Sequence, residues 1–379
     1  MRSKKIYLSP PFLNGDEIEY IKKTFKSNWI APVGPNIDLF EKEISSYLNV
    51  NNSLALNSGT SALHLALKVL NIKKGDYVFC SDLTFVASAN AIKYIGAIPV
   101  FIDSDLESWN MCHKSLELAL KSIKPKAVIV TNIYGQSADF EKIMSICDQK
   151  KIPIIEDAAE SLGAEYQSKK SGSFGLLSIL SFNGNKIITT SGGGMLLSNN
   201  EEYIKEAKNL STQSREDKIY YEHKKVGYNY RLSNVLASIG LSQFKNLDKR
   251  VKMKRKIFRN YYKKLNTRFG IEFMPEPDNC YSTRWLTVLK LKNSSLSKNS
   301  LNLIELLNEN GIESRPVWKP MHLQPLYKDY NFFSINESCS ISENLFLNGI
   351  CLPSGLNLQF EEQEKISSII IEFFSSIKS

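Results

Sequence analysis

Residues 181–195 have the sequence Ser181-Phe182-Asn183-Gly184-Asn185-Lys186-Ile187-Ile188-Thr189-Thr190-Ser191-Gly192-Gly193-Gly194-Met195. Strand-like apolar residues flank this stretch on both sides, which predicts a turn between two strands. A lysine held on such a turn can present its amine to a bound aldehyde and form a Schiff base. The three glycines let the backbone pass close to a flat ligand, where any Cβ atom would collide.

Two other interpretations of the stretch are a surface lysine before a glycine-rich hairpin and a phosphate-binding loop. The first is equally compatible with these residues alone, because glycine-rich turns are common. The second fails, because Lys186 precedes the glycines and is followed by Ile187, where a loop of the type GxxxxGK[ST] needs Ser or Thr. The rest of the chain decides between the remaining two.

Length and composition predict a soluble two-domain protein. A chain of 379 residues can build a large domain and a smaller one, and 42% hydrophobic with 23% charged residues is ordinary for a globular protein. No apolar run approaches the roughly 20 residues that span a bilayer, and no signal-peptide pattern is expected. Six cysteines without a CxxC pair predict free thiols in a reducing compartment, hence a cytoplasmic location, and the four dispersed histidines give a metal site little support.

The net charge of +9 favours an anionic substrate or nucleic acid. Its densest run, residues 249–256, is expected to be the solvated face of a helix. No nucleic-acid-binding motif accompanies it, so we expect no nucleic-acid partner.

A strand, a turn and a helix follow one another early in the chain. Residues 53–56 predict the strand, and apolar spacing over 62–70 predicts the helix. The turn between them contains Gly59 and Thr60. Unpaired N–H groups and the helix dipole make such a helix start an anion site. His64 lies inside the helix on a small-residue face, where core packing is expected.

Four further apolar runs alternate with helical stretches, which is typical of βαβ units and a mostly parallel sheet. These runs are 77–80, 99–102, 127–130 and 153–155. Ligands of such sheets bind beyond the carboxyl ends of the strands. Those ends carry Thr84-Phe85, Asp103, Tyr134-Gly135 and Glu156-Asp157.

Asp157 closes a fully apolar strand, where a carboxylate is costly without a partner. A protonated pyridine nitrogen would be such a partner. The alternative is a helix N-cap for the residues that follow.

The second half of the chain predicts a polar, aromatic-rich segment at 211–234 and one long helix at about 232–259 that links two domains. From about residue 268 the composition changes to the short strands and helices of an α+β domain. We therefore expect a large α/β domain, 1–248, and a small C-terminal α+β domain, 249–379.

Pyridoxal 5'-phosphate requires a phosphate site, an aromatic residue to stack on its ring, an acid and a lysine. The chain offers them in this order, as a helix terminus, an aromatic residue, a strand-end acid and a lysine on a turn. The chain also resembles the nucleotide-sugar aminotransferases of the DegT/DnrJ/EryC1/StrS family over about residues 6–352. The resemblance implies the aspartate-aminotransferase (type I) fold, with a mostly parallel seven-stranded sheet in the large domain. It rests on residues 55–64, 84–88, 156–160, 181–195, 227–234 and 315–322.

The resemblance implies a role for each part of the cofactor site. Lys186 would form the Schiff base, Asp157 would pair with the pyridinium nitrogen, and Phe85 would stack on the ring. Gly59, Thr60 and Ser181 would hold the phosphate. Asn229 would reach that phosphate from a neighbouring subunit, which implies a homodimer with a shared active site.

Two positions depart from the family pattern. Glu160 stands where many relatives carry Gln or His, although it remains a candidate cofactor contact, and Asn132 stands where His is frequent. The candidates for binding the substrate are Asn28, Trp29, Asn183, Arg231, Arg315 and His322.

Within the family, residues 182–190 together with 211–216 look most like the C4 aminotransferases of the UDP-bacillosamine route. This likeness implies transfer of the amino group of L-glutamate to C4 of a UDP-2-acetamido-2,6-dideoxy-4-ketohexose, giving the UDP-4-amino sugar and 2-oxoglutarate. A C3 aminotransferase of a dTDP- or UDP-linked 3-ketosugar is the alternative. A family dehydratase carries His in place of Lys186. A cofactor-binding regulator without turnover is disfavoured by the intact pair of Lys186 and Asp157.

Overall fold

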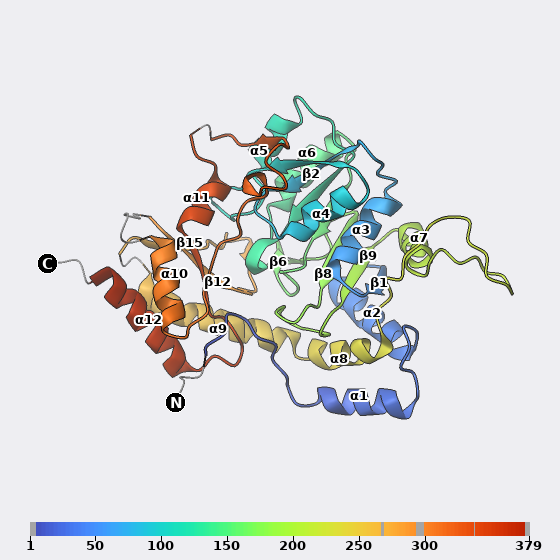
Figure 1. The fold of residues 1–379 in the computed structure, drawn as a ribbon, viewed down its shortest axis with the longest axis horizontal. Coiled ribbons are helices and arrows are strands. Elements are labelled where there is room, and N and C mark those ends of the chain that lie inside the picture. The colour runs from blue at the N-terminus through green and yellow to red at the C-terminus, as the bar shows by residue number, and fades with distance from the viewer. Residues whose placement is uncertain (1–4, 267–268, 293–298, 337, 376–379) are drawn as a thin grey trace.

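The computed structural model describes residues 5–266, 269–292, 299–336 and 338–375. Its largest sheet has eight strands in the order β1-β9-β8-β5-β4-β2-β3-β14 (Figure 1). The strand bounds, in chain order, are β1 Asn52–Leu56, β2 Tyr77–Ser81, β3 Ile98–Ile102, β4 Ala127–Thr131, β5 Ile154–Asp157, β8 Leu177–Ser181, β9 Gly194–Ser198 and β14 Phe332–Phe333.

The sheet is mostly parallel, as predicted. All pairs from β8 to β14 are parallel, whereas β9 runs antiparallel to both β1 and β8. Seven of the strands come from the first 198 residues, in agreement with the expected seven-stranded sheet. The eighth, β14, is a two-residue strand from the C-terminal part that pairs with β3, and it is too short to leave a periodic signal in the sequence.

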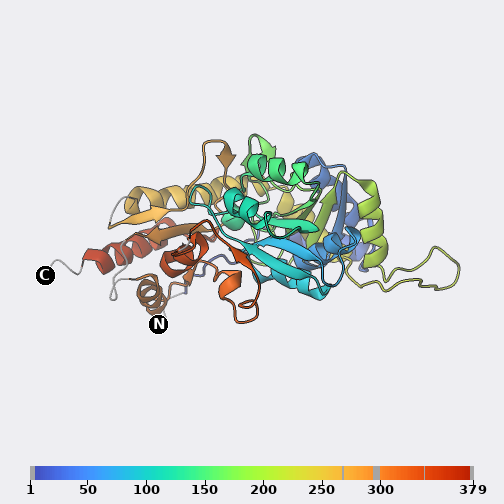
Figure 2. The ribbon, with the colours of Figure 1, turned by 90° about the horizontal axis from the view of Figure 1, so that it is seen from above.

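Side chains alternate between the two faces of this sheet, so each face has its own core. One face packs under α3 (Gly59–Val69), α4 (Val86–Tyr94) and α7 (Glu201–Ser211). The opposite face is covered by α2 (Pro35–Leu48), α5 (His113–Ala119), α6 (Phe140–Gln149) and α8 (Asn234–Phe244). Figure 2 shows these two helical layers, with α1 (Glu17–Lys26) outside α8 in Figure 1.

The C-terminal part forms a four-stranded antiparallel sheet in the order β10-β12-β15-β13. Its strands are β10 Ile271–Phe273, β12 Thr287–Leu291, β13 Arg315–Pro316 and β15 Gly349–Leu352. The helices of this part are α9 Leu247–Leu265, α10 Ser300–Glu309, α11 Ile341–Asn348 and α12 Phe360–Ser375. A third small sheet joins β6 (Glu165–Tyr166), β7 (Lys169–Lys170) and β11 (Cys280–Tyr281), and one-turn helices lie at Ile133–Gly135 and Met321–Leu323.

The single helix expected at 232–259 is two helices, so that prediction is wrong. The backbone of Asn246 leaves the helical conformation, at φ −107° and ψ 9°, and separates α8 from α9. This break lets α8 pack under the first sheet and α9 against the second, in succession along one side of the molecule (Figure 1). Helical periodicity continues across residues 244–247, so the sequence carries no sign of the break.

The prediction of a solvated basic face at 249–256 is wrong for two of its cations. The buried stripe of α9 includes Arg250 and Lys254, each only 2% exposed, whereas Lys249, Lys252 and Lys256 are exposed. Long cationic side chains bury their apolar stems readily when the charged head finds acceptors.

Two general features complete the fold. All six cysteines carry free thiols. Across the described ranges, no helix combines the length and apolar character needed to cross a membrane.

Candidate active site

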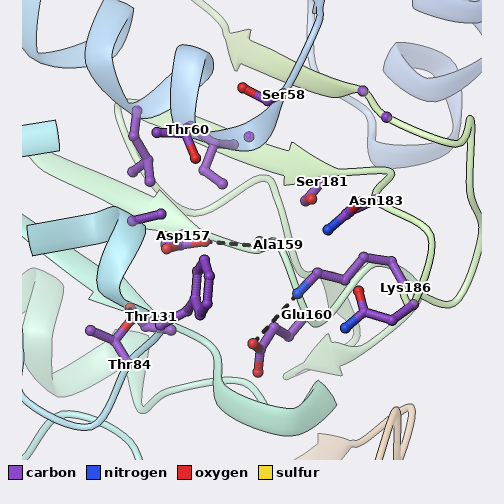
Figure 3. Close-up of a pocket in the computed structure, with 18 of the residues that line it drawn as sticks. Ser58, Thr60, Thr84, Thr131, Asp157, Ala159, Glu160, Ser181, Asn183 and Lys186 are labelled. Atoms are coloured by element: carbon purple, nitrogen blue, oxygen red, sulfur yellow. Dashed lines mark hydrogen bonds and ion pairs between the residues drawn. The ribbon is translucent and has the colours of Figure 1, made fainter. Parts of the chain in front are cut away.

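A cavity of about 250 Å³ opens at the carboxyl ends of β5 and β8 (Figure 3). The start of α3, the start of α4 and the loop between β8 and β9 form its walls. It brings together eight of the residues singled out from the sequence, which are Gly59, Thr60, Phe85, Asp157, Glu160, Ser181, Asn183 and Lys186.

The first wall is the N-terminus of α3. Ser58 caps the helix by accepting a 3.0 Å hydrogen bond from the backbone N–H of Ser61. The N–H groups of a first helical turn have no intrahelical acceptor, and the helix dipole adds positive potential there. Gly59 and Thr60 occupy this turn and line the cavity. The wall therefore suits an anionic group such as a phosphate.

Two of the three glycines are required by the packing of the protein itself. The expected approach to a flat ligand stays a prediction for Gly192 and Gly193, which line the cavity. A Cβ atom on Gly194 would lie 2.3 Å from the carbonyl carbon of Ser58, and one on Gly193 would lie 2.2 Å from Thr190 Oγ1. These glycines are needed because the backbone approaches other protein atoms. In contrast, a Cβ on Gly192 would meet only Asn57 O, at an ordinary 3.9 Å.

The second wall holds Asp157, which is 5% exposed. Its Oδ2 accepts a 2.6 Å hydrogen bond from Ser88 Oγ, and its Oδ1 accepts a 3.2 Å bond from the N–H of Ala159. Burial raises the pKa of this carboxyl, and the Ser88 hydroxyl opposes that rise. Residues 158–163 form turns, so Asp157 is not a helix N-cap. No cation of the described chain lies within ion-pair distance of it, which leaves room for a cationic ligand group.

Lys186 is not a surface lysine, since only 12% of its side chain is exposed. Its Nζ lies 3.5 Å from Glu160 Oε1 (Figure 3) and 4.2 Å from the ring centre of Trp285. The other oxygen of Glu160 accepts a 2.8 Å hydrogen bond from the backbone N–H of Tyr134, which fixes the carboxylate. Burial raises the pKa of Glu160, while the charge of Lys186 lowers it in part.

Aromatic side chains complete the cavity. Phe85 is 49% exposed and packs at 5.4 Å against Trp318, which in turn stacks on Tyr134. Neither Trp285 nor Trp318 was predicted from the sequence to be a site residue. Trp318 lies within the family-like segment 315–322, which could have identified it, whereas no motif surrounds Trp285.

Thr131 also lines the cavity and was not predicted. Its hydroxyl lies 2.8 Å from that of Thr84, which lines the cavity as well and was named among the strand-end residues. Asn132 does not line it, because its amide is occupied by Glu156 and Ser171 and its oxygen by the N–H of Ala138. Asn132 therefore has a structural role here.

Asn28, Trp29 and Arg315 lie away from the cavity lining. Asn28 and Trp29 precede α2, where the carbonyl of Trp29 accepts a 2.8 Å hydrogen bond from Asn234. Arg315 is exposed and pairs with Glu313 at 2.9 Å. Their expected contacts with the substrate remain predictions.

His322, Asn229 and Arg231 also lie outside the lining. His322 Nδ1 is 2.8 Å from Asp82 Oδ2, and its ring stacks on Phe332. Asn229 and Arg231 lie at the base of the segment 212–231, where Arg231 pairs with Leu56 at the end of β1. The middle of this segment, between α7 and α8, extends away from the body of the molecule (Figures 1 and 2). Because Asn229 is predicted to act in a neighbouring subunit, its position in one chain does not test that role.

The described residues contain no group of three His, Cys, Asp or Glu side chains arranged to hold a metal ion.

This fold and cavity define a fold type I aminotransferase. The model of the DegT/DnrJ/EryC1/StrS aminotransferase family matches residues 11–371, and the chain belongs to that family. The "Putative sugar aminotransferase Spr1654" of Streptococcus pneumoniae, solved in its PLP form, superposes with a TM-score of 0.91 and is 27% identical, covering 99% of this chain and 100% of that one. The protein is thus a nucleotide-sugar aminotransferase that depends on pyridoxal 5'-phosphate.

Three relatives are similar to this chain over most of their length, and the names of two of them specify a nucleotide sugar. The "Putative pyridoxal phosphate-dependent aminotransferase EpsN" of Bacillus subtilis is 49% identical, covering 99% of this chain and 97% of that protein. The GDP-perosamine synthase of Escherichia coli O157:H7 is 36% identical, covering 98% of this chain and 99% of that protein. The UDP-4-amino-4,6-dideoxy-N-acetyl-beta-L-altrosamine transaminase of Campylobacter jejuni is 34% identical, covering 83% of this chain and 84% of that protein.

Proposed function

We propose that this protein transfers the amino group of L-glutamate to C4 of a UDP-2-acetamido-2,6-dideoxy-4-ketohexose, giving the UDP-4-amino sugar and 2-oxoglutarate. The observation that carries the proposal is that Lys186 and the buried Asp157 line one cavity. The name of the Campylobacter relative, which specifies UDP and a 4-amino-4,6-dideoxy sugar, supports the substrate class.

The residues of the cavity fit pyridoxal 5'-phosphate. The first turn of α3, with Gly59 and Thr60, would hold the phosphate together with Ser181. Asp157, a buried carboxylate without a cationic partner in the described chain, would pair with the protonated ring nitrogen. Phe85 stands half exposed where a flat ring could stack on it.

When bound, the cofactor supplies an aldehyde that captures amines and a ring that accepts electrons. Lys186 would hold the aldehyde through its amine, and the same amine, when free, would take and return the proton at the substrate Cα. Glu160 would hold the Lys186 amine by charge and by proximity, since its carboxylate is fixed by the N–H of Tyr134. Asp157 keeps its partner nitrogen protonated and so favours electron withdrawal.

A second candidate is the same transfer onto a GDP-linked ketosugar. The identity of 36% to a GDP-perosamine synthase over nearly the whole of both chains favours it. The two candidates differ in the nucleotide and share the roles of Lys186 and Asp157.

We further propose a cytoplasmic homodimer. The segment 212–231 projects from the body and exposes Ile219, Tyr220, Tyr221 and Val226, which are between 61% and 108% exposed. Apolar side chains in such an extension are typical of an interface. In the dimer, Asn229 would approach the phosphate site of the neighbouring subunit. Free thiols support the cytoplasmic location.

We also propose that the chain divides into a large domain, 1–248, and a small domain, 249–379. The separate core under the second sheet supports this division, with α9 as the connection.

The decisive experiment offers the purified protein L-glutamate and a panel of UDP-, GDP- and dTDP-linked 3- and 4-ketosugars, with NMR of each product. Amination of the UDP-linked 4-ketosugar at C4, with the highest kcat/KM of the panel, supports the proposal. A preference for the GDP-linked sugar supports the second candidate, and amination at C3 contradicts both.

A further inference from the structure

The two peptide carbonyls that flank Lys186 are both held by hydrogen-bond donors. Asn185 O accepts bonds from the indole Nε1 of Trp285, at 2.8 Å, and from Ser9 Oγ, at 3.1 Å. Ile187 O accepts a bond of 3.3 Å from a guanidinium nitrogen of Arg250. The turn that carries Lys186 is therefore fixed on both sides of this residue by side chains distant in sequence.

Lys254 connects the donors on the Asn185 side. Its Nζ lies 2.6 Å from Ser354 O, 3.1 Å from Trp285 O and 3.3 Å from Ser9 Oγ. An ammonium group has three protons to donate, and these three oxygens can accept all of them. Lys254 thus holds both Ser9 and Trp285, the two residues that bind the carbonyl of Asn185.

The environment of Lys254 makes this arrangement costly. Lys254 is 2% exposed, and in the described chain no carboxylate lies within ion-pair distance of it. Burial, together with the charge of Arg250, lowers the pKa of Lys254 to about 7. A buried lysine without an acidic partner is unfavourable compared with an apolar side chain at the same position of a helix. Packing alone therefore gives no reason for a lysine here.

Trp285 extends the connection to the amine itself. Its backbone oxygen binds Lys254, its indole N–H binds Asn185 O, and its ring lies 4.2 Å from Lys186 Nζ. The ring is 1% exposed and has little freedom to move. A displacement of Trp285 would move both the turn and the surface on which the Lys186 amine rests.

We propose that Lys254 is a positioning residue for Lys186, acting through Trp285 and Ser9. Arg250, one helical turn earlier on the same face of α9, supports the Ile187 side of the same turn. Helix α9 thereby sets the direction of the amine that attacks the cofactor. This inference rests on the proposed role of Lys186 as the Schiff-base lysine.

The test compares two forms of the cofactor on the full-length protein freed of cofactor. With pyridoxal 5'-phosphate, the Lys186 nitrogen bonds to the aldehyde carbon and the aldehyde oxygen leaves as water, which produces visible absorbance. Pyridoxamine 5'-phosphate has an amine in place of the aldehyde and binds without this bond. The rate at which the visible band appears therefore reports the position of Lys186, and the Kd of pyridoxamine 5'-phosphate reports the rest of the cavity.

Lys254→Met is expected to slow the appearance of the visible band about tenfold, because a small misplacement of a reacting group has a large kinetic cost. The Kd of pyridoxamine 5'-phosphate should stay within about twofold of the wild-type value. Ser9→Ala removes only one of the two donors to Asn185 O, and it should slow the band about two- to threefold.

Tyr261→Phe is the matched control. Tyr261 lies on α9, is fully buried and donates a 3.1 Å hydrogen bond to Pro353 O, next to Ser354. In the described chain no hydrogen bond joins it to Trp285 or Ser9. This variant should keep the wild-type rate. Equal losses in rate and in pyridoxamine 5'-phosphate affinity for Lys254→Met would assign it a general structural role and overturn the proposal, as would an unchanged rate.

Two further results separate the possible failures. If Lys254→Met does not fold, Ser9→Ala decides, and an unchanged rate in that variant overturns the proposal. Borohydride reduction of the wild type, followed by peptide mapping, shows whether the cofactor is bound to residue 186. A label elsewhere refutes the role of Lys186, and with it this inference, whereas a label on Lys186 with unaffected variants refutes the inference alone.

Discussion

Glu156 and Asp157 are adjacent buried carboxylates on β5 that point to opposite faces of the sheet. Asp157 lines the cavity on the α3 side. Glu156, on the other face, accepts hydrogen bonds from the backbone N–H groups of Gly172 and Phe174 and from side chains that include Ser178. The strand alternation thus gives one acid to the proposed cofactor site and the other to the scaffold.

These different surroundings predict a loss of activity when Asp157 is replaced and a loss of stability when Glu156 is replaced. Asp157→Asn should lower kcat by about 10²- to 10³-fold with little change in stability, because the pyridinium loses its anionic partner. Glu156→Gln should keep the spectrum of the bound cofactor but lower the free energy of unfolding by about 2 kcal/mol or more, since an amide NH₂ would face donors. Urea unfolding and steady-state kinetics of both variants check this. The same loss of activity in both would contradict the assignment.

A second prediction concerns the helix start that is proposed to hold the phosphate. Gly194→Ala places a Cβ 2.3 Å from the carbonyl carbon of Ser58 and 2.4 Å from the nitrogen of Gly59, so the first turn of α3 must shift. Cofactor affinity should fall at least about tenfold, because the N–H groups of this turn lose their alignment. Gly184→Ala, whose Cβ would meet only Pro11 at 3.7 Å, is the control in an equilibrium titration with pyridoxal 5'-phosphate. Equal affinities for the two variants would refute this role of the helix start.

The pair of His322 and Asp82 predicts a pH-dependent contribution to stability. Burial opposes protonation of His322, but the hydrogen bond and the charge of Asp82 outweigh it and raise the pKa of His322 above its usual value. The stabilisation should therefore be complete below the unfolded pKa of about 6.5 and disappear as the pH rises through the folded value. The difference in unfolding free energy between wild type and His322→Gln should be larger at about pH 5.5 than at about pH 8.5.

His64 offers the control for that measurement. Burial, followed by the charge of Lys68, lowers the pKa of His64 to about 4, so this residue stays neutral over the same range. Below about pH 6.5 the unfolded chain takes up a proton on His64, whereas the folded chain does not. The gap between wild type and His64→Gln should therefore shrink from about pH 8.5 to about pH 5.5, which is the opposite trend to that of His322→Gln. A gap for His322→Gln that is flat or grows toward alkaline pH would contradict the account.

The proposed shared active site predicts complementation between inactive variants. If Asn229 serves the neighbouring subunit, a dimer of one Lys186→Ala chain and one Asn229→Ala chain contains one site with both defects and one site with neither. Mixed and re-equilibrated variants should therefore regain about a quarter of wild-type activity, for random association of equal amounts. Activity that stays at the level of the separate variants would show that the two residues serve the same subunit.

Hydrophobic periodicity and sequence motifs were sufficient to predict the parallel sheet. They were also sufficient to predict the residues of β5, α3 and the loop around Lys186 that line the cavity. Four apolar runs appear as β2 to β5, and the helix at 62–70 is α3, in which His64 is buried as expected. These features depend on local alternation and spacing, which the sequence records directly.

The contributions that depend on tertiary packing could not be predicted. Trp285 joins the cavity only because the second sheet packs beside the first, and no local pattern records this contact. Lys254 was assigned to a solvated face because its type is usually exposed, and only the oxygens of Trp285, Ser354 and Ser9 explain its burial. The break at Asn246 is likewise set by the two surfaces on which α8 and α9 pack.

All roles proposed for the cavity depend on Lys186 as the amine that bonds to pyridoxal 5'-phosphate. Borohydride reduction of the purified protein, followed by digestion and mass spectrometry, identifies the lysine that carries the cofactor. We expect a single modified peptide with the reduced cofactor on Lys186, and no such peptide in Lys186→Ala. A cofactor attached to another lysine of the wild type would contradict this expectation.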